Sequence, residues 1–184
     1  MRKPNTLMTT WLCVAMATGL LWIGGARTAR AIDLDGLAKK AVGSAENAAA
    51  GKVEQKVNAK LLADARKNQC SFKTDTDELA PGCDAKLKKL TNALVEAKKQ
   101  LDTAGVRNYK FEVSGHTDSA GSAEHNKQLS EKRAQVIVKE LTARGIAPSE
   151  IIAVGMGSEK PLVSPDNTPA KKAKNRRYEI RVRL

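Results

Sequence analysis

The sequence predicts an α+β fold: a two-layer βαβαββ-type sandwich in which a mixed sheet carries two helices packed on one face, preceded by a helical N-terminal extension. Two long segments repeat apolar residues at helical spacing, and several short segments alternate apolar and polar residues or are uniformly apolar, as strands are. The helical and strand-like segments alternate along the chain. Strand–helix–strand crossovers favour parallel neighbours, so a sheet with both helices on one face is the natural solution.

The first half of the domain is predicted to begin with a short strand over residues 70–73. After a Pro-Gly turn, a helix runs towards Gly105, which supplies a C-terminal stop. The apolar residues that share one face of this helix are Leu87, Leu90, Leu94, Ala97 and Leu101. Residues 109–113 then alternate apolar and polar side chains, which is typical of a half-buried strand.

The second half begins with a polar loop over residues 116–121. It leads into a second helix from about residue 122 to residue 144, which stops at Gly145. The buried stripe of this helix is predicted to hold Ala134, Ile137, Val138 and Leu141. Residues 151–154 form a short apolar strand, and residues 178–184 alternate apolar with charged side chains as the last strand.

The first 31 residues have the features of an export signal. Arg2 and Lys3 precede an uncharged apolar stretch over residues 7–26, and residues 29–31 supply the small-x-small pattern that a signal peptidase needs. We therefore expect residues 1–31 to be a signal peptide. The alternative is an uncleaved membrane anchor, because about 20 apolar residues can just span a bilayer.

Residues 32–68 form an Ala- and Lys-rich extension without aromatic residues. From residue 53 onward, small apolar side chains recur at helical spacing, which predicts a helix of about four turns that can lie against the domain. These residues are Val53, Val57, Leu61 and Ala65. We interpret the segment as a tether that ends in this helix, with a solvated helical spacer as the alternative, and the sequence predicts no partner for it.

The charge balance excludes several classes of protein. Residues 1–31 hold four basic residues and no acidic one, which leaves residues 32–184 with a net charge of +8. With 28% charged and 41% hydrophobic residues the chain is not disordered throughout, and a single apolar run excludes a polytopic membrane protein. Nucleic acid is not an expected partner, because only six aromatic residues are available for base stacking.

Two cysteines, Cys70 and Cys83, remain outside the predicted signal peptide. An even number of cysteines in an exported protein predicts a disulfide. Closing a loop of roughly 14 residues would stabilise the fold by about 3 kcal/mol in the chain-entropy model. Two buried thiols are the alternative.

A fixed anion and a fixed cation are predicted to face one shallow site. Asn126, Ser130 and Arg133 lie along one edge of the second helix, because they are three, four and seven residues apart. This row points towards the preceding loop, where Asp118 lies. The pair suits a zwitterionic ligand, since Arg takes a carboxylate bidentately and Asp accepts from an ammonium group. The alternative is an Asp118–Arg133 salt bridge that only pins the loop to the helix.

Sequence motifs in this region are similar to those of a known family. They are Gly115-His116-Thr117-Asp118-x-x-Gly121, Asn126-x-x-Leu129-Ser130-x-x-Arg133-Ala134, Gly145, Gly155-x-Gly157, Pro161, Asn167 and Asn175-Arg176-Arg177. In these residues the chain resembles the OmpA-like peptidoglycan-binding domain of outer-membrane protein A, peptidoglycan-associated lipoprotein and flagellar stator subunits. A looser likeness extends the predicted domain to residues 69–184.

The resemblance implies a non-enzymatic protein without a cofactor that binds peptidoglycan non-covalently and so anchors itself to the cell wall. In this family an Asp and an Arg grip the amino and carboxylate groups of diaminopimelate, and these correspond to Asp118 and Arg133. The supporting positions correspond to Thr117, Asn126, Leu129, the basic Arg177, and a first-strand loop residue near Thr74 or Asp75. The implied location is periplasmic, at the wall or outer membrane. The net charge of +8 favours attraction to the anionic wall or to lipopolysaccharide, so outer-membrane components or lipopolysaccharide are considered as further partners.

Three other interpretations are weaker. A metal-dependent enzyme could use His116, Asp118 and His125, but their spacing matches no metal-site pattern, and we predict neither a metal site nor an active site. A basic polyanion-binding module is favoured by the net charge and by the basic stretch over residues 171–183. An uncleaved N-terminal segment would make the protein a bridge from the inner membrane to the wall.

Overall fold

The structure is a computed structural model that describes residues 34–73 and 75–184. Its elements are α1 (Leu34–Lys67), α2 (Asp84–Thr103), β1 (Lys110–His116), α3 (Ala123–Ala143), the 3-10 helix η1 (Pro148–Glu150), β2 (Ile151–Gly155), α4 (Pro169–Asn175) and β3 (Arg177–Arg183). The predicted signal peptide, residues 1–31, lies outside the described part. Within that part, no helix combines the length and the apolar character that crossing a membrane requires.

The three strands form one mixed sheet in the order β2-β1-β3. β1 pairs in parallel with β2, with Phe111 opposite Ile151, and antiparallel with β3, with Val113 opposite Ile180. α3 is the crossover helix that connects the parallel strands β1 and β2, as the alternation of strands and helices along the sequence predicted. The mixed sheet and the α+β class are thus confirmed.

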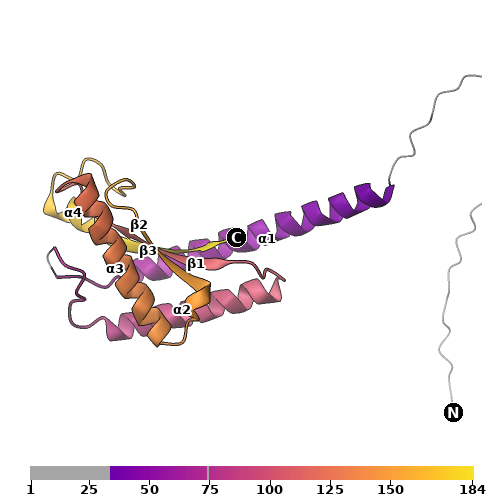
Figure 1. Ribbon diagram of the computed structural model, residues 1–184, viewed down its shortest axis with the longest axis horizontal. Helices are drawn as coiled ribbons and strands as arrows, with labels where there is room; N and C mark the ends of the chain where they lie inside the picture. Colours follow the sequence, from indigo (N-terminus) through magenta and orange to yellow (C-terminus); the bar gives the residue numbers. More distant parts are fainter. Residues whose placement is uncertain (1–33, 74) are drawn as a thin grey trace, which may run out of the picture.

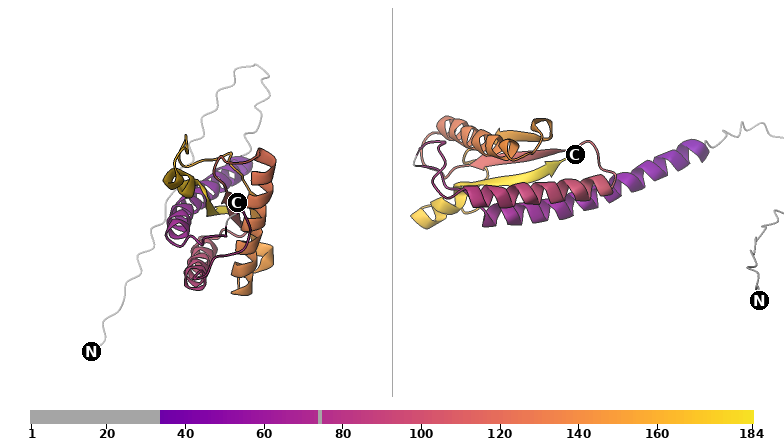
Figure 2. Two further views of the ribbon diagram at one scale, coloured as in Figure 1. Left: turned by 90° about the vertical axis from the view of Figure 1, so that its left-hand side faces the viewer. Right: turned by 90° about the horizontal axis from the view of Figure 1, so that it is seen from below.

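The core lies on one face of the sheet. Along β1 and β3 the alternate residues Phe111, Val113, Tyr178, Ile180 and Val182 are all buried together with the apolar faces of α2 and α3. The predicted stripe of α2 is confirmed in full. That of α3 is confirmed for Ala134, Ile137 and Leu141, whereas Val138 is only partly buried. Figure 2 shows the helices grouped around the sheet when the molecule is viewed end-on.

The opposite face of the sheet is polar and ion-paired. Nε of Arg183 lies 3.0 Å from a carboxylate oxygen of Glu112, and the Glu179 carboxylate accepts hydrogen bonds from Arg177 and Arg181, both at 2.8 Å. The period-2 pattern of the last strand therefore separates a core face from a charged face.

α3 packs on the backbone of the sheet without intervening side chains, because glycines stand at the crossing. A Cβ added to Gly115 would lie 2.1 Å from the carbonyl oxygen of Ser130, and one added to Gly155 would lie 2.6 Å from that of Lys127. The hydroxyl of Ser130 in turn accepts a hydrogen bond from the backbone N–H of Gly157 at 2.8 Å. These close approaches fix the height of α3 above β1 and β2.

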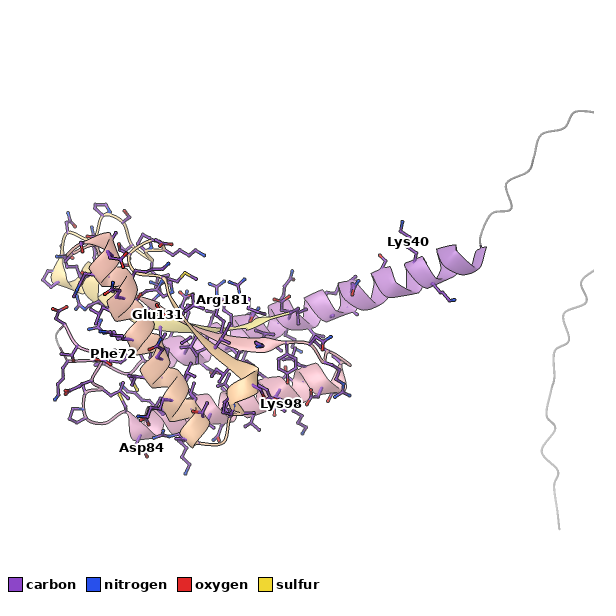
Figure 3. All side chains as sticks on the ribbon, in the orientation of Figure 1. Lys40, Phe72, Asp84, Lys98, Glu131 and Arg181 are labelled. Carbon is purple, nitrogen blue, oxygen red and sulfur yellow. The ribbon has the colours of Figure 1, made fainter. Side chains whose placement is uncertain are left out.

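α1 is longer than predicted and its second half is part of the core. The helix runs for 34 residues, which corresponds to about 51 Å. Val57, Leu61 and Ala65 are almost completely buried, so the packed unit begins well before residue 69. The first half projects beyond the rest of the molecule, where the exposed Lys40 stands away from it (Figures 1 and 3).

α1 also covers the free edge of β3. The side-chain amide of Asn58 accepts from the backbone N–H of Val182 at 2.6 Å and donates to its carbonyl oxygen at 3.3 Å. Gln69, just beyond the end of α1, does the same for Tyr178, at 3.0 and 2.7 Å. Two amide side chains thus satisfy backbone groups that a neighbouring strand would otherwise pair.

The predicted strand over residues 70–73 is wrong. This segment contributes only an isolated bridge between Phe72 and Leu79, and it turns back on itself through the hydrogen bond from Lys73 N–H to the carbonyl oxygen of Glu78. The physical reason is that α1 lies along the edge of β3, so this edge is not available for pairing with a further strand. The short helix α4 was also missed. Thr168 caps it by accepting from Lys171 N–H, and Pro169 begins it.

The predicted disulfide is not present. Cys70 and Cys83 are both buried free thiols, and Sγ of Cys70 lies 3.8 Å from the backbone carbonyl oxygen of Cys83. The backbone N–H of Cys70 donates to the hydroxyl of Tyr178 at 3.2 Å. The two cysteines are neighbours, as expected, but they pack as small apolar side chains in the core.

We expect the Cys70 thiol to be unreactive in the folded protein. Burial, followed by hydrogen bonding with Cys83, raises the pKa of Cys70 from 9.0 to about 12. Iodoacetamide labelling, mapped by peptide mass spectrometry, should leave Cys70 unmodified at pH 8 and modify both cysteines in denaturant without reductant. A disulfide-linked peptide pair in the unreduced sample would contradict the two thiols.

The same shift has a consequence for stability. The unfolded thiol ionises near pH 9 whereas the folded thiol stays protonated, so this group stabilises the fold below pH 9 and that contribution is lost as the pH rises towards 12. The free energy of unfolding should therefore fall more steeply between pH 9 and 10.5 in the wild type than in Cys70→Ala.

Candidate functional site

A cleft of about 970 Å³ is formed by elements at the end of the molecule opposite to the projecting half of α1. Figure 1 shows where these elements lie. Its walls come from the end of α1, residues 69–73 and Asp75, the loop after β1, the first turns of α3, Leu162, the end of α4 and the start of β3. All seven residues that the sequence analysis predicted for ligand binding line it: Asp75, Thr117, Asp118, Asn126, Leu129, Arg133 and Arg177.

Asp118 presents a fixed carboxylate from the loop that follows β1. One of its oxygens accepts from the backbone N–H of Ala120 at 3.0 Å, and the other accepts from Nη1 of Arg176 at 2.7 Å. The side chain is only 12% exposed. These contacts hold the carboxylate in one position and leave lone pairs for a further donor in the cleft.

Arg133 presents a guanidinium group from α3. Its Nε donates to the carbonyl oxygen of Thr76 at 2.9 Å, and its guanidinium carbon lies 5.1 Å from the centre of the Phe72 ring, which is labelled in Figure 3. Burial lowers the pKa of Arg133, while the Asp75 and Asp118 carboxylates act against that shift, and the group stays charged at neutral pH.

The predicted alternative of an Asp118–Arg133 salt bridge does not occur. Asp118 pairs with Arg176 instead, and within residues 34–73 and 75–184 no carboxylate oxygen lies within 4 Å of the Arg133 guanidinium. The cation is therefore oriented by carbonyl oxygens and an aromatic ring. Its charge is not neutralised by a side chain and remains available to a ligand.

Asp75 closes one side of the cleft. Its backbone adopts a φ of 56°, in the left-handed region that Asp tolerates better than most residues. Its carboxylate lies 2.8 Å from Nε2 of His125 in the first turn of α3. The segment that contains Asp75 is thereby held against α3, the helix that carries Arg133.

The polar side chains of Asn126 and Ser130 on α3 hold the segments around the cleft in place. The Asn126 side chain donates to the carbonyl oxygen of Ala120 at 2.8 Å, which holds the loop after β1 against α3. Ser130 is fully buried and does not face the cleft. By contrast, the buried hydroxyl of Thr117 has no hydrogen-bond partner among the described residues.

Arg177 lies at the cleft, but its charge is turned to the other face of the sheet, where it pairs with Glu179. Arg176 is the residue that contacts Asp118, and it was not among the site residues predicted from the sequence. The alternation of β3 could have found it, because Tyr178, Ile180 and Val182 face the core and Arg176 continues that series towards the cleft.

A second network holds the neighbouring loop. The Asp166 carboxylate accepts hydrogen bonds from the hydroxyl and, at 2.9 Å, the backbone N–H of Ser119, and from the Asn175 side chain, also at 2.9 Å. These hydrogen bonds lower the pKa of Asp166 to about 2. Asn175 of the Asn-Arg-Arg triplet is therefore structural and supports Arg176.

The residues weighed for a metal site are separated. Burial, then the positive charge of Arg177, lowers the pKa of His116 to about 4, so its ring is neutral at pH 7. His125 pairs with Asp75, and Asp118 pairs with Arg176. In the part of the chain that the structure describes, no three His, Cys, Asp or Glu side chains form a group that could hold a metal ion.

A comparison with protein-family models places this cleft in a known context. Residues 71–176, more than half of the chain, match the model of the OmpA family. The chain belongs to the OmpA family. The match includes Asp118, Arg133 and Arg176, and it leaves α1 outside.

Relatives of the OmpA family share this part of the chain. The peptidoglycan-binding protein ArfA of Mycobacterium bovis is 46% identical over 68 residues, which are 37% of this chain and 21% of ArfA. The peptidoglycan-associated lipoprotein of Pseudomonas aeruginosa is 30% identical over 110 residues, 60% of this chain and 59% of the lipoprotein. The chain therefore spans less than two thirds of either relative.

A solved structure supports the fold assignment. The MotB-like protein of Desulfovibrio vulgaris superposes with a TM-score of 0.54 at 20% identity, over 77% of this chain and 94% of the other. At this identity the likeness concerns the fold alone.

Proposed function

We propose that this protein binds peptidoglycan non-covalently, without catalysis, and thereby anchors itself to the cell wall. The observation that carries the proposal is the pair formed by Asp118 and Arg133, which line the same cleft and are held separately. Each charge is oriented by other groups, and neither is neutralised by the other. A zwitterionic side chain can therefore bridge them.

The ligand group is the diaminopimelate side chain of a stem peptide. Arg133 binds its carboxylate through charge-assisted hydrogen bonds, and Asp118 accepts from its ammonium group. The free hydroxyl of Thr117 adds a neutral hydrogen bond, and Leu129 and Phe72 supply apolar contact along the methylene chain. Two relatives support this ligand class, because ArfA is a peptidoglycan-binding protein and the lipoprotein is peptidoglycan-associated.

The affinity for a free stem peptide should be modest. Two or three charge-assisted hydrogen bonds contribute about 1.5–3 kcal/mol each and must offset the entropy lost on association. A dissociation constant of roughly micromolar to millimolar follows. The wall presents many copies of the peptide, so rebinding holds a weak binder in place.

Co-sedimentation with insoluble peptidoglycan tests the proposal. The purified protein should pellet with the wall polymer at high salt, which suppresses general attraction between a basic protein and an anionic polymer. Arg133→Ala and Asp118→Ala should remain in the supernatant, because each removes one of the two charges that bridge the ligand.

Arg107→Ala is the matched control for Arg133→Ala. Arg107 is 71% exposed outside the cleft, and its loss changes the net charge by the same amount. It should pellet like the wild type. Equal pelleting of all four proteins would refute the role of the pair, and so would Arg133→Ala or Asp118→Ala if either stayed bound while remaining folded by circular dichroism.

The proposal includes the cellular location. Residues 1–31 act as a signal peptide, and the product resides in the periplasm at the wall, where its net charge of +8 also favours contact with lipopolysaccharide. Mass spectrometry of the protein recovered from a periplasmic extract should give Ile32 as the first residue.

A further inference from the structure

The last turn of α1 brings an extra cation to the cleft. Arg66 lines the cleft together with the residues of the loop after β1 and of α3. It lies outside residues 71–176, the part that matches the OmpA family. The cleft of this protein is therefore completed by a segment that the family match does not contain.

The end of α1 is fixed against the domain, which holds the backbone near Arg66 beside the cleft. The hydroxyl of Tyr178 donates to the carbonyl oxygen of Asn68 at 2.6 Å, and the Gln69 side chain holds both backbone groups of Tyr178. Lys86 of α2 donates to the carbonyl oxygen of Gln69 at 2.8 Å. Four hydrogen bonds, three with Tyr178 of β3 and one with Lys86 of α2, thus hold the chain within three residues of Arg66.

The charges that line the cleft are unbalanced. Two carboxylates, Asp75 and Asp118, stand beside six cations, which are Arg66, Lys73, Arg133, Lys174, Arg176 and Arg177. Three of these cations already have carboxylate partners, since Lys73 pairs with Glu78, Arg176 with Asp118, and Arg177 with Glu179.

Arg133 is assigned above to one carboxylate of the ligand, which leaves two cations. Arg66 and Lys174 come from different elements, α1 and α4, and among the described residues neither forms an ion pair with a carboxylate. The cleft is also large for a single amino-acid side chain, because about 970 Å³ lies at the upper end of the volumes that enclose a drug-sized ligand.

We propose that Arg66, assisted by Lys174, forms a second carboxylate-binding position, which reads the free C-terminal carboxylate of the peptide whose diaminopimelate lies between Asp118 and Arg133. The inference rests on the proposed function and extends it. It makes the protein selective for wall peptides that end in a free carboxylate over those in which that group is amidated or consumed in a cross-link.

Titration calorimetry with two synthetic stem peptides tests the second position. The peptides contain diaminopimelate and differ only at the C-terminus, one a carboxylate and the other a carboxamide. The wild type should bind the carboxylate peptide about fivefold more tightly, the upper range for one partly exposed ion pair. Arg66→Gln should lose most of this preference and bind the carboxylate peptide at close to the affinity that the wild type has for the carboxamide, with the small remainder due to Lys174. Lys174→Gln should reduce the preference partially.

Lys67→Gln is the matched control, because Lys67 is the exposed neighbour of Arg66 on α1 and does not line the cleft. It should keep the fivefold preference. The inference is overturned if the wild type binds both peptides equally, if Arg66→Gln keeps the preference, or if that variant weakens both peptides to the same extent. Failure of the wild type to bind either peptide would instead refute the proposed function, and this inference with it.

Discussion

Substitution of Gly115 by alanine will lower the free energy of unfolding by about 3 kcal/mol or more. The new Cβ would lie 2.1 Å from the backbone carbonyl oxygen of Ser130, and backbone cannot move aside as a flexible side chain can. α3 must lift from β1, which breaks the hydrogen bond between Ser130 and Gly157. Urea denaturation followed by circular dichroism measures the loss.

Gly51→Ala is the control for this experiment. Gly51 lies in α1, and a Cβ there meets no other atom within 4 Å. Alanine is the better helix former, so this variant should gain about 0.5–1 kcal/mol. A loss of less than 1 kcal/mol in Gly115→Ala would show that α3 does not rest on the backbone of β1 as described.

Leu61→Ala will destabilise the protein by about 2–4 kcal/mol. Leu61 of α1 is 3% exposed in the core, and its truncation removes apolar burial and leaves a cavity. A tether would not respond in this way. The measurement therefore decides whether α1 belongs to the folded unit.

The adjacent Leu62 provides the comparison. Its side chain is partly exposed and is not among the residues that pack against the core. Leu62→Ala should cost about 1 kcal/mol or less. Equal effects of the two substitutions, or none from either, would contradict the packing of α1 on the domain.

Much of the fold could be predicted because its signals are local. The stripe of leucines in α2 and the alternation in β3 repeat with the periods of a helix and a strand, and a single sequence shows both. The extent of α1 could not be predicted in this way. Its apolar stripe is thin, and Asn58 in α1 and Gln69 just after it bond to backbone groups more than a hundred residues away.

The candidate site could likewise be predicted from the sequence only in part. Asp118 and Arg133 lie in motifs of short range, so sequence reasoning could place them on a loop and the helix that follows. The partner of Asp118 is one of two adjacent arginines, Arg176 and Arg177. The alternation of side chains along β3 directs Arg176 towards Asp118. Arg66 reaches the cleft only because α1 lies along β3, which no motif records.

The hydrogen bonds from Asn58 and Gln69 to β3 bear on how copies of this protein behave when they are crowded together. An uncovered strand edge is a template on which a second chain can add its own strand, and repetition of that step leads to aggregates. The two amide side chains occupy such positions near both ends of β3. α1 and the residues just after it therefore keep this edge from pairing with another molecule, and release of α1 from β3 would expose the edge to strand addition.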